Sequence, residues 1–187
     1  VGIDVDEVLE AGARANSPER VRPLVGGEIP LVVGLERADF TKGIPERLDA
    51  LAAAYEAGAR FHYAGYGSPT RGGVEGYEQL QATIEAKAAT LTEKATAAGC
   101  VFFQAHESIP WDEVIALMRD ADVVFTSSLS DGMNLVPLQG AAVQALKPQE
   151  KRATIFCGRG AGVAETYRDC QQDGLMIVNP FERDEMR

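Results

Sequence analysis

The sequence of 187 residues contains little cysteine and little histidine, with three and two copies respectively. The cysteines, Cys100, Cys157 and Cys170, are odd in number and fit no metal-binding spacing, so we expect a reduced, cytoplasmic protein. Neither His62 nor His106 has an evident nucleophile or acid partner, so the histidines support neither a catalytic triad nor a zinc site. Cys157 and His62 lie in apolar runs and are expected to be structural.

Long apolar runs and an excess of basic residues are also missing. No run approaches the roughly 20 apolar residues that a membrane span needs, and no signal peptide is recognisable. Against 28 acidic residues there are 18 basic ones, which gives a net charge of −10. Such a surface repels nucleic acid and anionic membranes, so neither is an expected partner. Any site for an anion must gather its Arg, Lys and backbone N–H groups locally.

The residues that are present alternate between two patterns along the chain. Apolar runs rich in β-branched or aromatic residues cover 30–35, 60–65, 101–105, 122–127, 153–157 and 175–179. Helix-like stretches cover 5–14, 44–57, 74–98, 111–120, 134–146 and 161–169. Continuous apolar strands alternating with helices indicate a parallel sheet with helices on both faces. We therefore predict an α/β, Rossmann-like domain over residues 1–187, with 1–28 as a lead-in segment.

Basic residues follow two of the predicted strands, and ligands of parallel sheets bind at that edge. Arg37 and Lys42 come after the first strand, beside a glycine and a helix N-terminus, where they could clamp a diphosphate. Arg71 lies between a threonine and two glycines after the second strand. The pattern alone equally fits surface cations that pair with Glu36 and Asp39, and an exposed loop around Arg71.

The stretch 130–135 (SDGMNL) joins the fourth strand to a helix. Asn134 can cap that helix, and Asp131 offers an acceptor suited to sugar hydroxyls. Gln139, about one helical turn further on, can reach a ribose. The backbone N–H groups expected to be free for an anion or a sugar hydroxyl are those of Gly132, Met133, Asn134 and Leu135. Taken alone, the stretch also fits a plain Asp-Gly turn followed by a helix cap.

Two further motifs are weaker. Asp4 and Asp6 resemble the Asp-x-Asp of haloacid-dehalogenase-type phosphatases, but no later Lys and paired Asp residues accompany them. A turn before a helix is the favoured interpretation of these two residues. Residues 158–162 (GRGAG) do not match G-x-G-x-x-G, and no acidic residue ends a second strand about 20 residues later, so we exclude an NAD site. The same loop can still line a pocket.

Several motifs together resemble trehalose-6-phosphate synthases. LERADFTKGIPERLDAL, PTRGGVEGY, ADVVFTSSLSDGMNLVPLQ, AGVAET and IVNPFERDE occur in the order of that family, across essentially the whole chain. The family consists of retaining glycosyltransferases with two facing Rossmann-like domains, the GT-B arrangement. They transfer glucose from a nucleotide-diphosphate-glucose to glucose 6-phosphate without a metal or a cofactor. The resemblance implies that residues 1–187 are the donor-binding domain, that the acceptor domain is absent, and that this chain alone is inactive.

The resemblance also implies roles for single residues. Arg37 and Lys42 would hold the donor diphosphate and stabilise the leaving group, and Arg71 would reach the acceptor phosphate. Val136 would lie near the ribose and the base. The donor glucose and phosphate would be held by Asp131 and by the N–H groups of Met133, Asn134 and Leu135. Front-face displacement is thought to operate in the family, which suits a site without a protein nucleophile. The resemblance leaves open whether the full-length protein forms a homo-oligomer.

Three positions depart from the family pattern. Gln139 stands where a ribose-binding Glu is usual, Ser130 replaces an Arg, and Gly73 replaces an Asp. The base (UDP, GDP or ADP) and the acceptor therefore stay open, since related transferases make glucosylglycerol phosphate or couple cyclitols. A non-catalytic nucleotide-sugar-binding module is the alternative from another class. The retained Arg37, Lys42 and Asp131 favour the transferase, whereas Gln139 keeps the binding module as an alternative.

Overall fold

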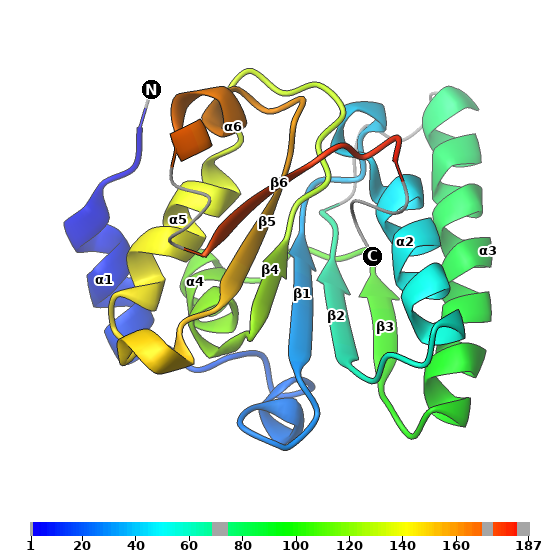
Figure 1. Cartoon of the computed structure of the whole chain (residues 1–187), viewed down its shortest axis with the longest axis horizontal. Coiled ribbons are helices and arrows are strands. Elements are labelled where there is room, and N and C mark those ends of the chain that lie inside the picture. The colour runs from blue at the N-terminus through cyan, green and yellow to red at the C-terminus, as the bar shows by residue number, and fades with distance from the viewer. Residues whose placement is uncertain (1, 69–74, 170–173, 183–187) are drawn as a thin grey trace.

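The centre of the molecule is a six-stranded sheet, seen in a computed structural model that describes residues 2–68, 75–169 and 174–182. The strand order is β3-β2-β1-β4-β5-β6, and every neighbouring pair is parallel (Figure 1). This is the order of Rossmann-like folds, so the predicted fold class is confirmed. Three residues discussed above, Arg71, Gly73 and Cys170, lie outside the described ranges.

The strands lie close to where the apolar runs predicted them. They are β1 (Leu31–Leu35), β2 (His62–Tyr66), β3 (Phe102–Ala105), β4 (Val123–Phe125), β5 (Thr154–Gly158) and β6 (Leu175–Val178). All of β1 is buried, with Leu31, Val33 and Leu35 in one core and Val32 in the other. Because β1 packs on both faces, its sequence is apolar throughout instead of alternating.

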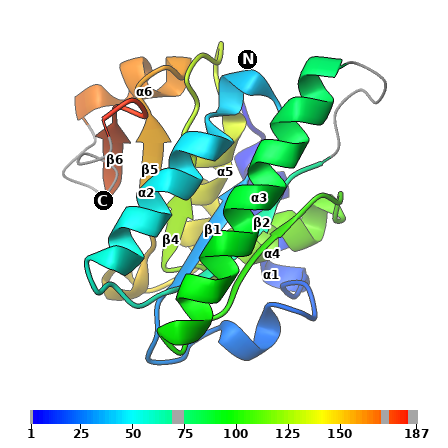
Figure 2. The ribbon, with the colours of Figure 1, turned by 90° about the vertical axis from the view of Figure 1, so that its right-hand side faces the viewer.

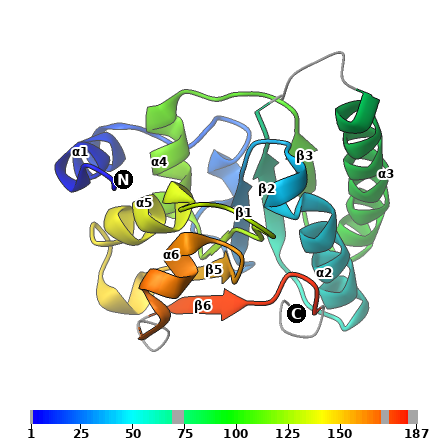
Figure 3. The same cartoon turned by 90° about the horizontal axis from the view of Figure 1, so that it is seen from above.

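Helices cover both faces of the sheet. On one face α1 (Val5–Arg14), α4 (Trp111–Asp120) and α5 (Leu135–Gln144) pack against one another. On the other face α2 (Ile44–Glu56) packs against α3 (Glu75–Ala97), and Figure 2 shows this pair in front of the sheet. The short α6 (Gly162–Thr166) contacts α5 near the end of the sheet formed by β5 and β6 (Figure 3).

The lead-in segment forms α1 without a preceding strand. Asp4 is the N-cap of this helix, because its carboxylate accepts a hydrogen bond of 3.1 Å from the N–H of Glu7. Asp4 and Asp6 are both exposed. These observations agree with the favoured interpretation of a turn before a helix and give no support to a phosphatase site.

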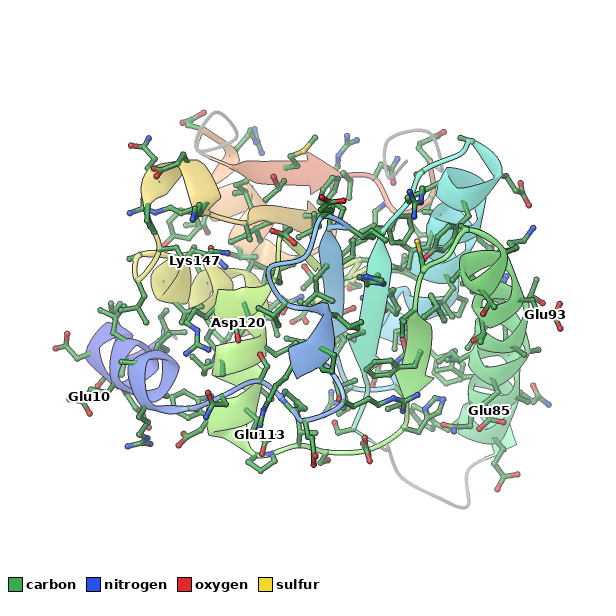
Figure 4. The ribbon with its side chains drawn as sticks, turned by 90° about the horizontal axis from the view of Figure 1, so that it is seen from below. Glu10, Glu85, Glu93, Glu113, Asp120 and Lys147 are labelled. Carbon is green, nitrogen blue, oxygen red and sulfur yellow. The ribbon has the colours of Figure 1, made fainter. Side chains whose placement is uncertain are left out.

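The acidic side chains lie mainly on the outer surfaces of the helices. Glu10 on α1 and Glu85 and Glu93 on α3 are exposed, and they point away from the sheet in the view from below (Figure 4). None of the helices in the described part of the chain is both long and apolar enough to cross a membrane.

Candidate functional site

Two connecting segments meet at the carboxyl edge of the sheet, where the strand order reverses. Residues 36–43 follow β1 and residues 126–134 follow β4, which are neighbours in the sheet. Lys42 of the first segment forms an ion pair with Asp131 of the second, from Nζ to Oδ2. Their side chains are only 15% and 19% exposed, so water and salt screen the pair little. The fold therefore brings two of the predicted site residues into direct contact.

The backbone around Lys42 is fixed by its own turn. The carboxylate of Asp39 accepts hydrogen bonds of 3.0 and 2.8 Å from the N–H and the hydroxyl of Thr41. Gly43 then takes φ 62° and ψ 33°, the left-handed region that favours glycine. A Cβ at Gly43 would overlap the carbonyl oxygen of Ser127, so a larger residue does not fit. Sequence and sterics thus place Lys42 against the segment after β4.

Arg37 is the more accessible of the two predicted cations. Its Nη2 lies 3.7 Å from Oδ2 of Asp39, and its side chain is 60% exposed. An exposed pair at this distance is weak, so Arg37 can exchange Asp39 for an anionic ligand. The pKa of Asp39 is lowered first by the backbone N–H of Thr41, with a smaller contribution from Arg37. Arg37 therefore lies where the sequence predicted it, at the edge and available.

A cavity of about 330 Å³ opens beside Arg37, and we call it the edge cavity. Val136 lines it, as do Ile109, Trp111 and Glu107, which follow β3 or begin α4. The sequence interpretation missed these last three residues, although their place after a strand on the same edge was a usable signal. The edge cavity thus combines a cation, apolar side chains and two aromatic residues, Trp111 and Tyr66.

A larger cavity of about 670 Å³ lies elsewhere, between the residues before α1, α5 and α6. Apolar residues such as Ile3, Leu138 and Val163 predominate in its lining. Neither Arg37 nor Lys42 reaches it. Since an anionic ligand needs a cation and Arg37 lines the edge cavity, we place the site there despite its smaller volume.

The prediction of free backbone N–H groups was wrong for two of the four residues. The N–H groups of Met133 and Asn134 both donate to Oδ1 of Asp131, each at 3.2 Å. The cause is local: an Asp side chain readily accepts from backbone N–H groups two and three residues later. The N–H groups of Gly132 and Leu135 have no partner within the described ranges. Only these two remain open to a ligand without rearrangement.

Asp131 is consequently saturated with donors. Partial burial on its own raises the pKa of this carboxyl group. The hydrogen bond and charge of Lys42, together with the N–H groups of Met133 and Asn134, outweigh burial and lower the pKa of Asp131 below its usual value. Asp131 is therefore ionised at neutral pH and held in one orientation. It is an acceptor and a counter-ion for Lys42, and it is poorly placed to act as a nucleophile.

The predicted helix cap is confirmed. Asn134 is the N-cap of α5, and its Oδ1 accepts a hydrogen bond of 3.2 Å from the N–H of Val136. Its amide nitrogen donates to the hydroxyl of Ser128 at 2.9 Å. Among the described residues it is the single non-glycine with positive φ, at 58°. The side-chain bonds on both sides hold Asn134 in this uncommon conformation.

The G-x-G-x-G loop supports the segment after β4. A Cβ on Gly158 would overlap the Ser128 carbonyl oxygen, and one on Gly160 would overlap that of Leu129. The absence of side chains allows the N–H of Asp131 to donate to the carbonyl of Gly160 at 3.0 Å. The N–H of Gly162 donates in turn to the carbonyl of Asp131, also at 3.0 Å. These glycines are required for close packing of two loops, which is a different role from binding a dinucleotide.

The remaining candidates from the sequence have other places in the fold. His62 is structural as expected, because its Nδ1 accepts from the N–H of Val101 at 3.0 Å. Cys157 is completely buried, and burial raises the pKa of its thiol to about 11, which makes it unreactive. Gln139 is half-buried on α5. The described ranges hold no cluster of three or more His, Cys, Asp or Glu side chains that could bind a metal ion.

Comparison with known proteins gives a consistent set of relatives. A family model described as Glycosyltransferase family 20 matches residues 1–187. The UDP-forming alpha,alpha-trehalose-phosphate synthase of Candida albicans is 29% identical over 193 residues, covering 100% of this chain and 38% of that protein. Its counterpart in Yarrowia lipolytica is 32% identical over 196 residues, covering 100% and 39%. The chain thus spans about two fifths of the length of these relatives.

Solved structures show the same fold. An alpha,alpha-trehalose-phosphate synthase (UDP-forming) from Burkholderia xenovorans, in complex with glucose-6-phosphate, matches with a TM-score of 0.84 and 24% identity. The match covers 100% of this chain and 41% of that one. A trehalose-6-phosphate structure from E. coli, bound with UDP-2-fluoro glucose, matches with a TM-score of 0.81 and 24% identity over the same shares.

Proposed function

The chain belongs to glycosyltransferase family 20, and from this premise we propose that it is the donor-binding half of a GT-B transferase. The complete enzyme would move glucose from a nucleotide-diphosphate-glucose to glucose 6-phosphate and release trehalose 6-phosphate. The acceptor domain would belong to a part of the protein outside this chain. We propose UDP as the first nucleotide to test, since the curated relatives named above are UDP-forming.

The observation that carries the proposal is the position of Arg37 and Lys42 at the switch point of the sheet. A diphosphate bound there would lie between one accessible cation and one cation that is already neutralised by Asp131. Lys42 would exchange Asp131 for a phosphate oxygen, which frees the carboxylate to accept from sugar hydroxyls. The open N–H groups of Gly132 and Leu135 would add neutral donors to the same anion.

The edge cavity is suited to the nucleoside. It begins at Arg37, so a nucleotide whose diphosphate touches that residue can extend into the cavity. Val136 and Ile109 provide apolar walls, and Trp111 offers a ring on which a base can stack. The base would therefore be held mainly by shape and stacking in this part of the site.

The proposed chemistry is charge stabilisation at the leaving group. As the bond from sugar to phosphate breaks, negative charge grows on the diphosphate, and Arg37 and Lys42 would stabilise it from the segment after β1, where the turn at Gly43 holds the backbone of Lys42. Asp131 is occupied by three donors, which fits a mechanism without a covalent intermediate on this residue. Front-face displacement, in which the leaving phosphate assists deprotonation of the acceptor, needs no further residue from this chain.

The test uses Trp111, which is the sole tryptophan of the sequence and lines the edge cavity. We expect titration with UDP to change its fluorescence and to saturate at lower concentration than titration with GDP or ADP. Calorimetry under the same conditions, without metal, provides the stoichiometry. If no nucleotide diphosphate binds either to this chain or to the full-length protein, the donor-binding proposal is wrong.

A substitution at Gln139 should strengthen donor binding. The resemblance places this side chain near the ribose, where a carboxylate would accept hydroxyl hydrogen bonds roughly twice as strong as those of a neutral amide. We therefore expect Gln139→Glu to raise the affinity for UDP several-fold, equivalent to about 1 kcal/mol. The control is 2′,3′-dideoxy-UDP, whose affinity should be the same for both proteins. Equal gains for both nucleotides would contradict a ribose contact.

The second candidate is a nucleotide-sugar-binding module without turnover. Gln139, which replaces a charged residue of the family, is the observation that keeps it open. Both candidates require donor binding, so turnover separates them. Formation of UDP from UDP-glucose and glucose 6-phosphate by the full-length protein supports the transferase, and binding without any product supports the module.

A further inference from the structure

A buried ion pair lies beneath the site and has no role in the function proposed above. Glu36, the residue between β1 and Arg37, is paired with Arg47 of α2 through Oε2 and Nη1. The two side chains are 1% and 0% exposed. Burial raises the pKa of Glu36, although the charge of Arg47 offsets part of that effect. Buried ion pairs seldom stabilise a fold more than apolar residues of the same size would, so stability is a poor explanation for this one.

The pair is connected to both segments of the site. On the Glu36 side, Oε1 accepts from the hydroxyl of Ser128 at 3.2 Å, and Ser128 in turn accepts from the Asn134 amide at 2.9 Å. Asn134 is the cap whose backbone N–H is bound by Asp131. The Glu36 carboxylate is therefore linked, through two side chains, to the turn that presents Asp131.

Arg47 provides the connection to Lys42. Its Nη1 donates to the carbonyl of Phe125 at 3.1 Å and to the hydroxyl of Ser127 at 3.4 Å. The Ser127 hydroxyl lies 3.0 Å from the carbonyl oxygen of Lys42 and 2.8 Å from that of Gly43, and it donates to this pair of acceptors. The same ion pair thus reaches the backbone of Lys42 on one side and the Asp131 turn on the other.

The neighbouring sheet leaves little freedom for this network. A Cβ on Gly34 of β1 would overlap the hydroxyl of Tyr63 and lie 3.0 Å from Cζ of Arg47. Arg47 also keeps Nε and Nη2 buried without hydrogen-bond partners in the described part of the molecule. The sheet therefore confines the guanidinium on this side, and Nη1 alone carries its hydrogen bonds to the network.

We propose that Glu36 and Arg47 are positioning residues for the donor site, whose buried side chains hold Lys42 and the Asp131 turn at a fixed separation. The inference rests on the proposed function for its ligand, and on the hydrogen-bond network alone for its mechanism. Two anchors held at a fixed separation lower the entropic cost of ordering a flexible ligand, such as a diphosphate, that spans both of them.

The decisive variant is the double substitution Glu36→Met with Arg47→Met. Both charges leave together, and the methionines fill similar space, so the sheet is expected to fold. We expect a single cooperative thermal transition, at least tenfold weaker binding of UDP, and at least tenfold loss of amide-exchange protection at Met133 and Asn134. Protection of Ala64 in the centre of the sheet should stay unchanged, because the effect is confined to the site.

Two further variants complete the experiment. Lys87→Met removes the pair between Lys87 of α3 and Asp49 of α2, which is about 30% exposed and contains no residue of the Glu36–Arg47 network, and it should change neither UDP binding nor exchange at the site. Glu36→Gln keeps an acceptor for Ser128 but leaves Arg47 without its counter-charge, and it should reproduce both losses.

The outcomes separate this inference from the proposed function. If wild type binds no nucleotide while the double variant loses protection at Met133 and Asn134, the positioning role stands and the donor assignment is wrong. If the folded double variant keeps wild-type affinity and protection, the positioning role is wrong. The positioning role is also wrong if the double variant and Glu36→Gln both fail to fold. It is wrong as well if amide-exchange protection falls as much at Ala64 as at Met133 and Asn134. In both cases the ion pair would stabilise the whole fold.

Discussion

Replacement of Lys42 by alanine is expected to lower the kcat of the full-length protein by about 10²–10³-fold, the loss usual for one preorganised group at a developing negative charge. The affinity for UDP should also fall by about tenfold or more, in line with the roughly 1.5–3 kcal/mol of a charge-assisted hydrogen bond. Initial rates of UDP release and a calorimetric titration measure the two effects. The expectation depends on the position of Lys42 in the segment after β1, where the turn at Gly43 fixes its backbone.

Loss of the Lys42–Asp131 pair could also disturb the fold, so thermal unfolding must accompany the kinetics. The matched control is Lys94→Ala, which removes a surface pair with Glu56 whose side chains are 32% and 64% exposed. It should leave kcat, affinity and unfolding temperature unchanged within error. If Lys42→Ala keeps wild-type kcat in a folded protein, Lys42 does not stabilise the leaving group.

Replacement of Gly160 by alanine is expected to lower the free energy of unfolding by about 3 kcal/mol or more. The new Cβ would overlap a backbone carbonyl, that of Leu129, which cannot rotate away as a side chain can. The loop would have to separate from the segment after β4, at the cost of both hydrogen bonds to Asp131. Urea unfolding followed by circular dichroism measures the loss, and UDP binding should weaken with it because Asp131 moves.

Gly27→Ala is the matched control for this effect. A Cβ at Gly27 would meet nothing within 4 Å, so the free energy of unfolding should change by about 0.5 kcal/mol or less. A loss at Gly160 no larger than the loss at Gly27 would show that the two loops separate at no cost. The close packing of the G-x-G-x-G loop would then not be what holds Asp131.

The elements of the fold were predictable because each strand is buried on both faces. A strand such as β1, apolar at every position, has few alternatives in a protein of this size. The proximity of Arg37, Lys42 and Asp131 followed from the same pattern, since all three lie in segments that follow strands ending at one edge. The pattern carried no information on strand order, which depends on contacts between residues far apart in the chain.

The details of the site were harder to predict because they depend on competition between partners. Glu36 was considered as a surface partner for the cations next to it, but the fold buries it against Arg47, eleven residues away in the chain. The N–H groups of Met133 and Asn134 were expected to be free, but both donate to the Asp131 carboxylate. Trp111 was assigned to a helix without notice of its place beside the edge cavity. For Glu36 and Trp111 the deciding contact comes from the packing of another segment, whereas for Met133 and Asn134 it comes from a side chain of the same turn.

The Lys42–Asp131 pair would also determine which anions the proposed donor site admits. Asp131 is a tethered counter-ion, and a tethered group competes at an effective concentration of about millimolar or higher. A small anion that binds Lys42 alone must displace the Asp131 carboxylate and forms no other contact to offset that loss. A ligand that also binds Arg37 and supplies hydroxyl groups to Asp131 replaces the lost ion pair with new contacts for both Lys42 and Asp131. On the proposed function, the site would discriminate by the number of groups that an anion engages. Free phosphate at ordinary concentration would not displace Asp131 from Lys42, whereas a nucleotide sugar would.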